Sequence, residues 1–556
     1  MDRQRILPSF HFRNVLAAAT TLVATLTVGG VLSFGMSARC DAQIRRAPGS
    51  CPRPAEGASV NNPPELRSHD GTLEVSLHLR YEQTTVSQGP PRYCFVTDEG
   101  MESPTLRVAP GDRLIIHLHN DLPPASTAQT NRHRLAASDE AADCAGNGMD
   151  ASVTNLHFHG MSVPPLCHQD DVIHTAVQAG QSFDYRVTIP ANEPPGLYWY
   201  HPHPHGFSER QIQGGASGAL IVEGLQKRFP PLVTLDERIL ILRDQQRIGP
   251  EPPGTKVPTW DVSVNYVPIV YPQTIPAVIL TTGKQEFWRV VNASADTIYD
   301  LEVEADHEAQ PLRIFALDGV GLTSPETKSD LLLPPGARAE FVVAIPPMAE
   351  HAQLMTKSWF TGPAGDNDTA RPLATLVRSS ALRDNAESWK EPQTSPARSV
   401  SNASADKSAP VRRRLYFSQR SSNPQDPDNF VLYFITVEGQ NPTPYKTGMP
   451  PNIVVHEGDQ EEWTIENRSD EDHVFHIHQI HFRVLQVNGH PTSDTAMRDT
   501  IDVPYWNGKG PFPSVTLQMD FSDPNAVGTF LYHCHILKHE DMGMMGSIEV
   551  LPRNGL

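Results

Sequence analysis

Apolar and polar residues alternate in short runs along most of the chain. One run, 104–108, leads through Pro110-Gly111-Asp112 into an alternating stretch, 113–120, that ends in Asn120. Alternation with a period of two predicts a half-buried β-strand, and the Pro-Gly-Asp sequence predicts a turn. This segment therefore predicts two strands joined by a turn.

The same order of apolar strand, turn and alternating strand occurs twice more. Residues 453–459 lead into Glu462–Asn467, and a looser version runs from Thr282 to Asn292. Helical periodicity is weak throughout, and 51 of the 556 residues are Pro, which disfavours long helices. We therefore expect an all-β protein of three similar sandwich or barrel units.

Composition indicates where these units begin and end. Residues 386–412 are rich in Ser, Ala, Pro and charge and predict a linker, and Glu223-Gly224 closes the first strand-rich block. We place domains at 60–225, 226–385 and 413–556. The chain length, at roughly 150 residues per domain, suggests three or four folded units.

The N-terminal segment predicts export. Arg3, Arg5 and Arg13 precede an uncharged and mostly apolar stretch, 15–36, and small residues suited to a signal peptidase follow at Cys40-Asp41-Ala42. We expect residues 1–42 to be a signal peptide and the mature protein to be periplasmic or secreted, with no membrane contact after cleavage. A stretch of 22 residues also suffices for a permanent membrane anchor, so anchoring stays an alternative.

Net charge narrows the range of partners. The chain has 45 Lys and Arg against 64 Asp and Glu, a formal charge of −19. Binding to nucleic acid is built from cationic contacts to phosphates, so this balance argues against a nucleic-acid partner. We expect a monomer whose partners are small molecules.

The six cysteines fall into separate groups. Cys40 would leave with the signal peptide, and Cys534 lies between two histidines. The other four allow two disulfides in three different pairings, or remain free thiols. These four are Cys51, Cys94, Cys144 and Cys167.

Most of the notable histidines, out of 24 in the chain, lie in four short segments. Each segment contains a His-x-His pair, and on a strand such a pair projects both imidazoles from one face. Eight imidazoles are too many for one zinc ion, so they predict a multinuclear site for a metal that accepts imidazole: copper, zinc, iron or nickel. The pairs are His157 and His159, His201 and His203, His476 and His478, and His533 and His535.

The last segment favours copper. Cys534, His539 and Met544, together with His473, supply the thiolate, the two imidazoles and the weak axial thioether of a blue-copper centre. Zinc is the alternative for a set of Cys and His ligands, but the Cys-x4-His-x4-Met spacing argues against it. On a strand Cys534 points away from its two histidine neighbours, so a short covalent path would join the two metal sites.

These four segments resemble, in order, the copper-binding signatures of the bacterial, laccase-like multicopper oxidases. The resemblance implies three consecutive cupredoxin-like Greek-key β-barrel domains, four copper ions and no other cofactor. It implies a type 1 copper held by His473, Cys534, His539 and Met544, and a type 2 copper held by His157 and His476. The implied ligands of the two type 3 coppers are His159, His201, His203, His478, His533 and His535.

The resemblance also implies a reaction. A small reducing substrate, such as a phenol, a diamine, a pigment or a metal ion, would be oxidised at the type 1 copper while the other coppers reduce O2 to water. Oxygen reduction consumes protons, and Glu540 matches the family's acidic position after the type 1 histidine. Either Asp170 or Asp171 resembles the other family carboxylate.

Two further possibilities follow from the sequence. Asp470, Glu471 and Asp472, beside His473, would favour cationic or metal substrates, and the alternative is a solvated acidic turn. The alternative function is a periplasmic copper-resistance or copper-binding protein with Cu⁺ oxidase activity. His205 and His481 lie off the ligand pattern, and we expect them to be structural.

Overall fold

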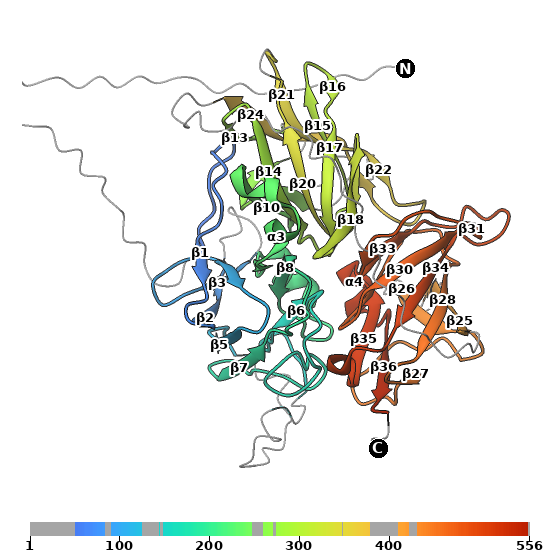
Figure 1. Ribbon diagram of the computed structural model, residues 1–556. Helices are drawn as coiled ribbons and strands as arrows, with labels where there is room; N and C mark the ends of the chain where they lie inside the picture. The colour runs from blue at the N-terminus through green and yellow to red at the C-terminus, as the bar shows by residue number, and fades with distance from the viewer. Residues whose placement is uncertain are drawn as a thin grey trace, which may run out of the picture. The chain divides into compact units, whose positions relative to one another are not determined.

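The computed structural model describes residues 51–83, 91–124, 144, 148–246, 260–270, 274–346, 349–378, 410–421 and 431–553 (Figure 1). The expected signal peptide and all but the last three residues of the expected linker lie outside this range. Strands dominate the described residues, which confirms the all-β prediction. Their helices are short: α2 (Ser208–Gln213), α3 (Leu225–Arg228), α4 (Leu537–Asp541) and the 3-10 turns η2 (Pro230–Thr234) and η3 (Pro524–Ala526).

The first pair of sheets has a five-stranded sheet in the order β1-β4-β9-β8-β6 and a four-stranded sheet in the order β3-β2-β5-β7. Leu77, Ile116 and Leu220 from the two sheets pack in one hydrophobic cluster. The strands are β1 (Glu65–Arg67), β2 (Thr72–Glu82), β3 (Arg92–Val96), β4 (Thr105–Val108), β5 (Arg113–Asn120), β6 (His157–His159), β7 (Ser182–Thr188), β8 (Gly196–His201) and β9 (Gly218–Val222).

The middle pair has a seven-stranded sheet in the order β12-β11-β10-β14-β20-β17-β18 and a sheet in the order β13-β24-β21-β15-β16, with β19 beside β15. A short ribbon, β22-β23, lies apart from both. The strands are β10 (Asp236–Gln246), β11 (Trp260–Val264), β12 (Val267–Ile269), β13 (Ala277–Thr281), β14 (Gln285–Asn292), β15 (Tyr299–Ala305), β16 (Glu308–Ala309), β17 (Leu312–Leu317), β18 (Val320–Lys328), β19 (Leu331–Leu333), β20 (Arg338–Ala344), β21 (Ala352–Lys357), β22 (Trp359–Phe360), β23 (Asn367–Asp368) and β24 (Arg371–Arg378).

The third pair has a sheet in the order β26-β25-β28-β34-β30-β31, with β32 beside β30, and a five-stranded sheet in the order β27-β36-β35-β29-β33. Trp463, Leu517 and Phe530 are part of its core. The strands are β25 (Val411–Ser421), β26 (Val431–Val437), β27 (Ile453–His456), β28 (Gln460–Asn467), β29 (His473–Ile477), β30 (Phe482–Val487), β31 (His490–Pro491), β32 (Met497–Arg498), β33 (Thr500–Val503), β34 (Ser514–Asp520), β35 (Gly528–Cys534) and β36 (Met545–Leu551).

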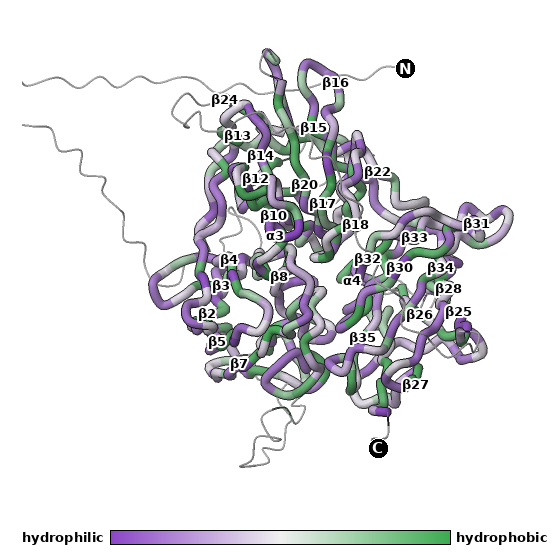
Figure 2. Tube along the Cα trace, in the orientation of Figure 1, coloured by the Kyte–Doolittle hydropathy of each residue, from purple (hydrophilic) through white to green (hydrophobic). Residues whose placement is uncertain are grey.

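The predicted strand–turn–strand repeat forms the same arrangement in each pair of sheets. The strand after the turn pairs in parallel with the first long strand of its own unit: β5 with β2, β14 with β10, and β28 with β25. Apolar and polar residues alternate along many of these strands in Figure 2, as expected for strands with one buried face.

The Asn that ends each repeat has one structural role in all three units. Asn120, Asn292 and Asn467 are fully buried at the ends of β5, β14 and β28. In each case the side-chain amide donates to two backbone carbonyls, and its oxygen accepts the backbone N–H of the residue two positions later. The repeated Asn therefore fixes the loop that follows the strand, since every polar atom of the amide is satisfied.

The first and middle units pack directly against each other. Leu197 and Trp199 of β8 share an apolar cluster with Ile239 of β10 and Val291 of β14. The backbone N–H of Leu197 also donates to the buried Glu340 carboxylate at 2.8 Å. This contact places β8, which ends in His201, against the central strands of the middle unit.

Two disulfides select one of the three pairings that the sequence allowed. Cys51 bonds to Cys94, and Cys144 bonds to Cys167, while Cys534 is free and buried. The first joins the start of the described chain to β3. The second ties residue 144 to the loop that follows the first histidine motif.

We predict that the Cys51–Cys94 bond stabilises the first unit. Its cysteines are 43 residues apart, and closing a loop of that length in the unfolded chain contributes up to about 4 kcal/mol. The variant with both cysteines changed to Ala should melt at a lower temperature in calorimetry. Peptide mapping without reductant should recover Cys51–Cys94 and Cys144–Cys167; cross-linking between the pairs, or an unchanged melting temperature, would contradict this.

Candidate metal centres

Strand pairing aligns the histidine motifs two by two. In the first unit β6 runs antiparallel to β8 with His157 opposite His201, and in the third unit β29 runs antiparallel to β35 with His476 opposite His533. Residues opposite each other on neighbouring strands point to the same face of the sheet. Each unit therefore presents one face of paired imidazoles.

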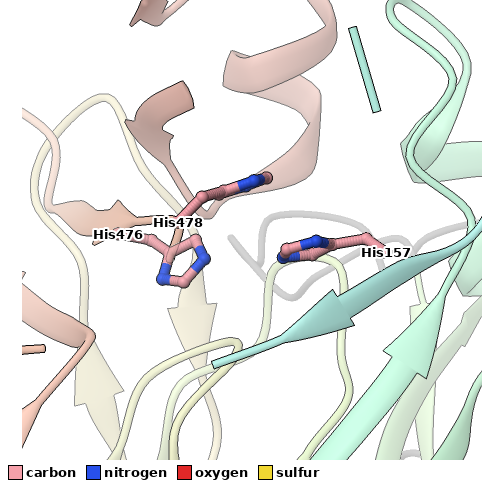
Figure 3. Close-up of side chains that lie close together, drawn as sticks. All are labelled: His157, His476 and His478. Carbon is pink, nitrogen blue, oxygen red and sulfur yellow. The ribbon is translucent and has the colours of Figure 1, made fainter. Parts of the chain in front are cut away.

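The two faces meet in one buried group, which we call the eight-histidine cluster. His157 stacks on His478 with ring centroids 3.9 Å apart, and His159 stacks on His476 at 4.0 Å. Figure 3 shows His157, carried by β6, pointing toward His476 and His478 of the third unit. No member is more than 1% exposed: His157, His159, His201, His203, His476, His478, His533 and His535.

Several donor nitrogens of this cluster converge. The Nε2 atoms of His203 and His478 lie 3.4 and 3.1 Å from Nε2 of His533. Ligand atoms of His157, His476 and His478 also lie within 4.8 Å of one another, as do those of His157, His159 and His201. The spacing suits several metal ions, each shared by two or three imidazoles.

Hydrogen bonds on the outer edge of the cluster orient its rings. The Nδ1–H groups of His201, His476 and His533 donate at 2.9 Å to the backbone carbonyls of Pro202, Asp499 and Cys534, respectively. An imidazole that donates from Nδ1 carries its lone pair on Nε2. Nε2 of His157, His201 and His476 has no hydrogen-bond partner among the described residues, although each is buried.

Burial also favours the uncharged form of seven of these rings. It lowers the pKa of His201 to about 3. Neutral imidazole is the form that binds metal, so the cluster is poised to accept cations at neutral pH. Burial lowers the pKa of the following members well below the usual value for histidine: His157, His159, His203, His478, His533 and His535.

A second buried group, which we call the Cys534 centre, combines His473, Cys534 and His539. The Nδ1 atoms of the two histidines lie 3.2 Å apart, and each lies 3.7 Å from Sγ of Cys534. Met544 is fully buried in the same hydrophobic cluster as Cys534, and the backbone N–H of Cys534 donates to its carbonyl at 3.0 Å. The structure thus brings all four predicted residues to one place.

The loop anchored by Asn467 orients the imidazoles of the Cys534 centre. Ser469 Oγ donates to Asn467 Oδ1 at 2.6 Å, so it accepts the Nε2–H of His473 at 2.8 Å. Glu471 Oε1 lies 3.3 Å from Nε2 of His539, and the backbone carbonyl of Glu471 accepts from the Asn467 amide. Both histidines therefore present Nδ1 toward the thiol.

The thiol of Cys534 completes this donor set. Burial raises its pKa well above the usual value, and the backbone N–H of Val474 donates to Sγ at 3.4 Å. A bound cation would stabilise the thiolate in such a site. One thiolate, two imidazoles and the thioether of Met544, which belongs to the same buried cluster as Cys534, suit copper.

Glu540 lies where a proton donor to the eight-histidine cluster is expected. Its carboxylate oxygens lie 3.6 Å from Nε2 of His203 and 3.2 Å from Nδ1 of His533. Burial, and next the charge of Asp541, raise the pKa of Glu540 well above its usual value, which favours the protonated form. The residue also borders a cavity of about 290 Å³ shared with His205 and Tyr445.

The structure separates the two candidate aspartates. Asp170 is buried and accepts from Nδ1 of His157 at 3.0 Å and from the side chain of Gln479 at 2.6 Å. Asp171 instead accepts from His174 at 3.0 Å. Of the two, Asp170 contacts the cluster directly.

Three residues at these centres carry no recognisable sequence signal. Asp499 and Arg338 contact metal-site histidines, or each other, only through the tertiary fold, and Ser469 reaches His473, four residues later, from the loop before β29. Spacing rules detect residues that share a strand, and none of these three shares one with a histidine of the motifs. His205 and His481, expected to be structural, lie beside the cluster, and His481 donates from Nε2 to the Asp318 carbonyl at 3.0 Å.

Comparisons with known proteins agree with this geometry. Two family models, both described as multicopper oxidase, match residues 144–227 and 416–554. A multicopper oxidase of Staphylococcus aureus is 24% identical over 73% of this chain and 78% of its own. The McoA multicopper oxidase of Aquifex aeolicus has the same fold, with a TM-score of 0.64, 20% identity, and coverage of 89% of this chain and 100% of that one.

A further solved structure shares the fold. A Campylobacter jejuni multicopper oxidase, described as a metallo-oxidase, has a TM-score of 0.63 and 22% identity and covers 90% of this chain and 96% of that one. These comparisons confirm the predicted cupredoxin-type β fold.

We predict that Ser469→Ala weakens metal binding at the Cys534 centre. His473 would lose the acceptor that fixes its ring and its tautomer, and loss of such an outer hydrogen bond typically lowers metal affinity by about 10- to 100-fold. Copper titration followed by absorption should show this loss. Ser522→Ala, at an exposed serine, is the control and should bind like the unchanged protein; equal affinities for both variants would refute the role of Ser469.

Proposed function

The chain belongs to the multicopper oxidase family, and we propose that it couples one-electron oxidation of a small reducing substrate to four-electron reduction of O2 to water. The observation that carries this proposal is the pair of buried donor sets joined through one tripeptide. Cys534 belongs to one set, and its chain neighbours His533 and His535 belong to the other. The backbone and side chains of this tripeptide therefore connect the two centres through covalent bonds alone.

We assign four copper ions to these residues. His473, Cys534, His539 and Met544 would hold a type 1 copper, and His157 and His476 a type 2 copper. Bound copper would supply the one-electron chemistry, taking electrons from substrate and passing them to O2. The type 3 pair would be held by His159, His201, His203, His478, His533 and His535, and the unpartnered buried nitrogens of the cluster support this assignment.

The surroundings of His539 favour a cationic substrate. Tyr433 stacks on its ring at 4.1 Å, and Glu471 lies beside its outer nitrogen. Asp366 is a second carboxyl group near Glu471: burial, and next the charge of Glu471, raise its pKa, while exposed Lys538 lowers it. Metal ions are therefore the substrates that we propose first, ahead of phenols, diamines and pigments.

We also propose that the protein is exported. Two disulfides in the first unit support an oxidising compartment. No helix among the described residues is long and apolar enough to cross a membrane. A copper-resistance protein with Cu⁺ oxidase activity would use the same sites, so this remains the second candidate function.

The first test measures O2 uptake by the copper-loaded protein. We expect O2 uptake with ferrous ion and with a phenol, together with a blue absorption band. The Cys534→Ser variant should lose the O2 uptake and the blue band, because the thiolate is removed. Added salt should weaken the use of ferrous ion more than that of the phenol, since screening acts on charge attraction. A fully loaded protein that consumes no O2 would favour the copper-binding role, and a blue Cys534→Ser variant would refute the type 1 assignment.

The second test concerns the proton donor. Glu540→Gln removes the buried acid that faces His203 and His533, so O2 reduction should slow by about two to four orders of magnitude. Anaerobic bleaching of the blue band by substrate should proceed as before. Glu308→Gln, at an exposed position on β16, is the control; reoxidation by O2 at the same rate in all three proteins would exclude Glu540 as the donor.

A further inference from the structure

One buried ion pair lies where the three units meet. Arg338, the first residue of β20, and Asp499, just before β33, are both fully buried. The guanidinium donates from Nη1 to Asp499 Oδ1 at 2.7 Å and from Nη2 to Oδ2 at 2.6 Å. This bidentate pairing fixes the plane of the carboxylate as well as its position.

Arg338 contacts every unit of the chain. Nε donates to the carbonyl of Leu197 in the first unit at 3.3 Å, and the backbone N–H donates to Asp318 in the middle unit at 2.8 Å. The carboxylate of Asp499 belongs to the third unit. One side chain therefore sets the separation of the segments that carry the first and third groups of histidines.

The carboxylate held by Arg338 faces the eight-histidine cluster. Asp499 Oδ1 lies 3.4 Å from Nε2 of His159 and 3.5 Å from Nδ1 of His476, and it also accepts from Thr500 Oγ1 at 2.7 Å. The backbone carbonyl of the same residue accepts the Nδ1–H of His476. Asp499 thus contacts one histidine from each half of the cluster.

Two glycines show how closely the chain is fitted around this pair. Gly160, which follows His159, has a φ of +86°, and a Cβ there would lie 2.1 Å from Nη2 of Arg338. A Cβ on Gly336 would lie 2.9 Å from the ring of His535 and 3.0 Å from that of His159. Neither position admits a side chain without moving the pair or the imidazoles.

Charge explains why both members are needed. A lone guanidinium beside a cluster that binds cations would repel them, and a lone buried carboxylate would be costly to desolvate. Paired, the two charges cancel, and each carboxylate oxygen keeps a lone pair for contacts with imidazole or hydroxyl groups. The middle unit, which supplies none of the assigned copper ligands, contributes the arginine.

We propose that Arg338 is a positioning residue for the type 2 and type 3 coppers, acting through Asp499 on His159 and His476. The inference rests on the proposed function, because it assigns those histidines to copper. The middle unit then controls the geometry of a site to which it contributes no ligand.

The test compares Arg338→Lys with Arg289→Lys in the full, copper-loaded chain. Lysine keeps the positive charge but lacks the guanidinium group that donates to both carboxylate oxygens of Asp499. Arg289 is the matched control: it is equally buried, lies on the adjacent β14, and pairs with Glu237 and Glu340. No described contact joins it to a histidine of the cluster.

We expect Arg338→Lys to keep its blue band but to lose the other coppers to a chelator about 10- to 100-fold more readily, with an altered electron paramagnetic resonance signal of the type 2 copper. Substrate KM should stay constant while kcat falls. Arg289→Lys should retain the copper and the signal. Wild-type copper retention and signal in Arg338→Lys, with only a lower melting temperature, would overturn the proposal.

A second variant keeps the test decisive if Arg338→Lys does not fold. Asp499→Asn preserves size and one acceptor oxygen, and it should lose the same coppers; retention equal to wild type would again overturn the proposal. A wild-type protein with no blue band and no O2 uptake would instead refute the proposed function itself. The two failures are therefore distinguishable.

Discussion

The structure depends on burying eight imidazoles in one place. Desolvation disfavours the charged form of a buried ring, and a buried polar nitrogen without a partner is unfavourable, so a ligand that binds these nitrogens would stabilise the fold. In His201, His476 and His533, Nδ1 donates to a backbone carbonyl, which leaves Nε2 of each ring for the ligand. The three pairs of sheets provide the rigid surroundings that prevent these rings from turning away.

Hydrogen bonds from the surrounding loop also orient the imidazoles of the Cys534 centre. Asn467 repeats the role of Asn120 and Asn292, and its loop carries Ser469 and Glu471, whose side chains contact His473 and His539. A structural motif present in all three units has thus been adapted in the third to orient His473 and His539. The hydrogen bonds that fix this loop therefore also fix the geometry of the metal site.

The sequence predicted most of this arrangement because the relevant signals are local. Period-two alternation reveals strands, and a His-x-His pair on a strand must share a face, so the fold class and the histidine groups were accessible. The choice between Asp170 and Asp171, the pairing of Cys51 with Cys94, and the contact of Arg338 with Asp499 depend on segments distant in the chain. Such contacts follow from packing, for which a single sequence offers no periodic signal.

The split between His157–His203 and His473–His535 has a consequence for how the protein acquires its metal. A chain emerging from synthesis completes the first half of the cluster some 270 residues before the second half exists. Half of the cluster offers open coordination to any cation, whereas the complete cluster is closed and buried. Binding by all eight imidazoles together therefore requires that both the first and the third unit have folded, so the complete site forms only after the C-terminal unit does.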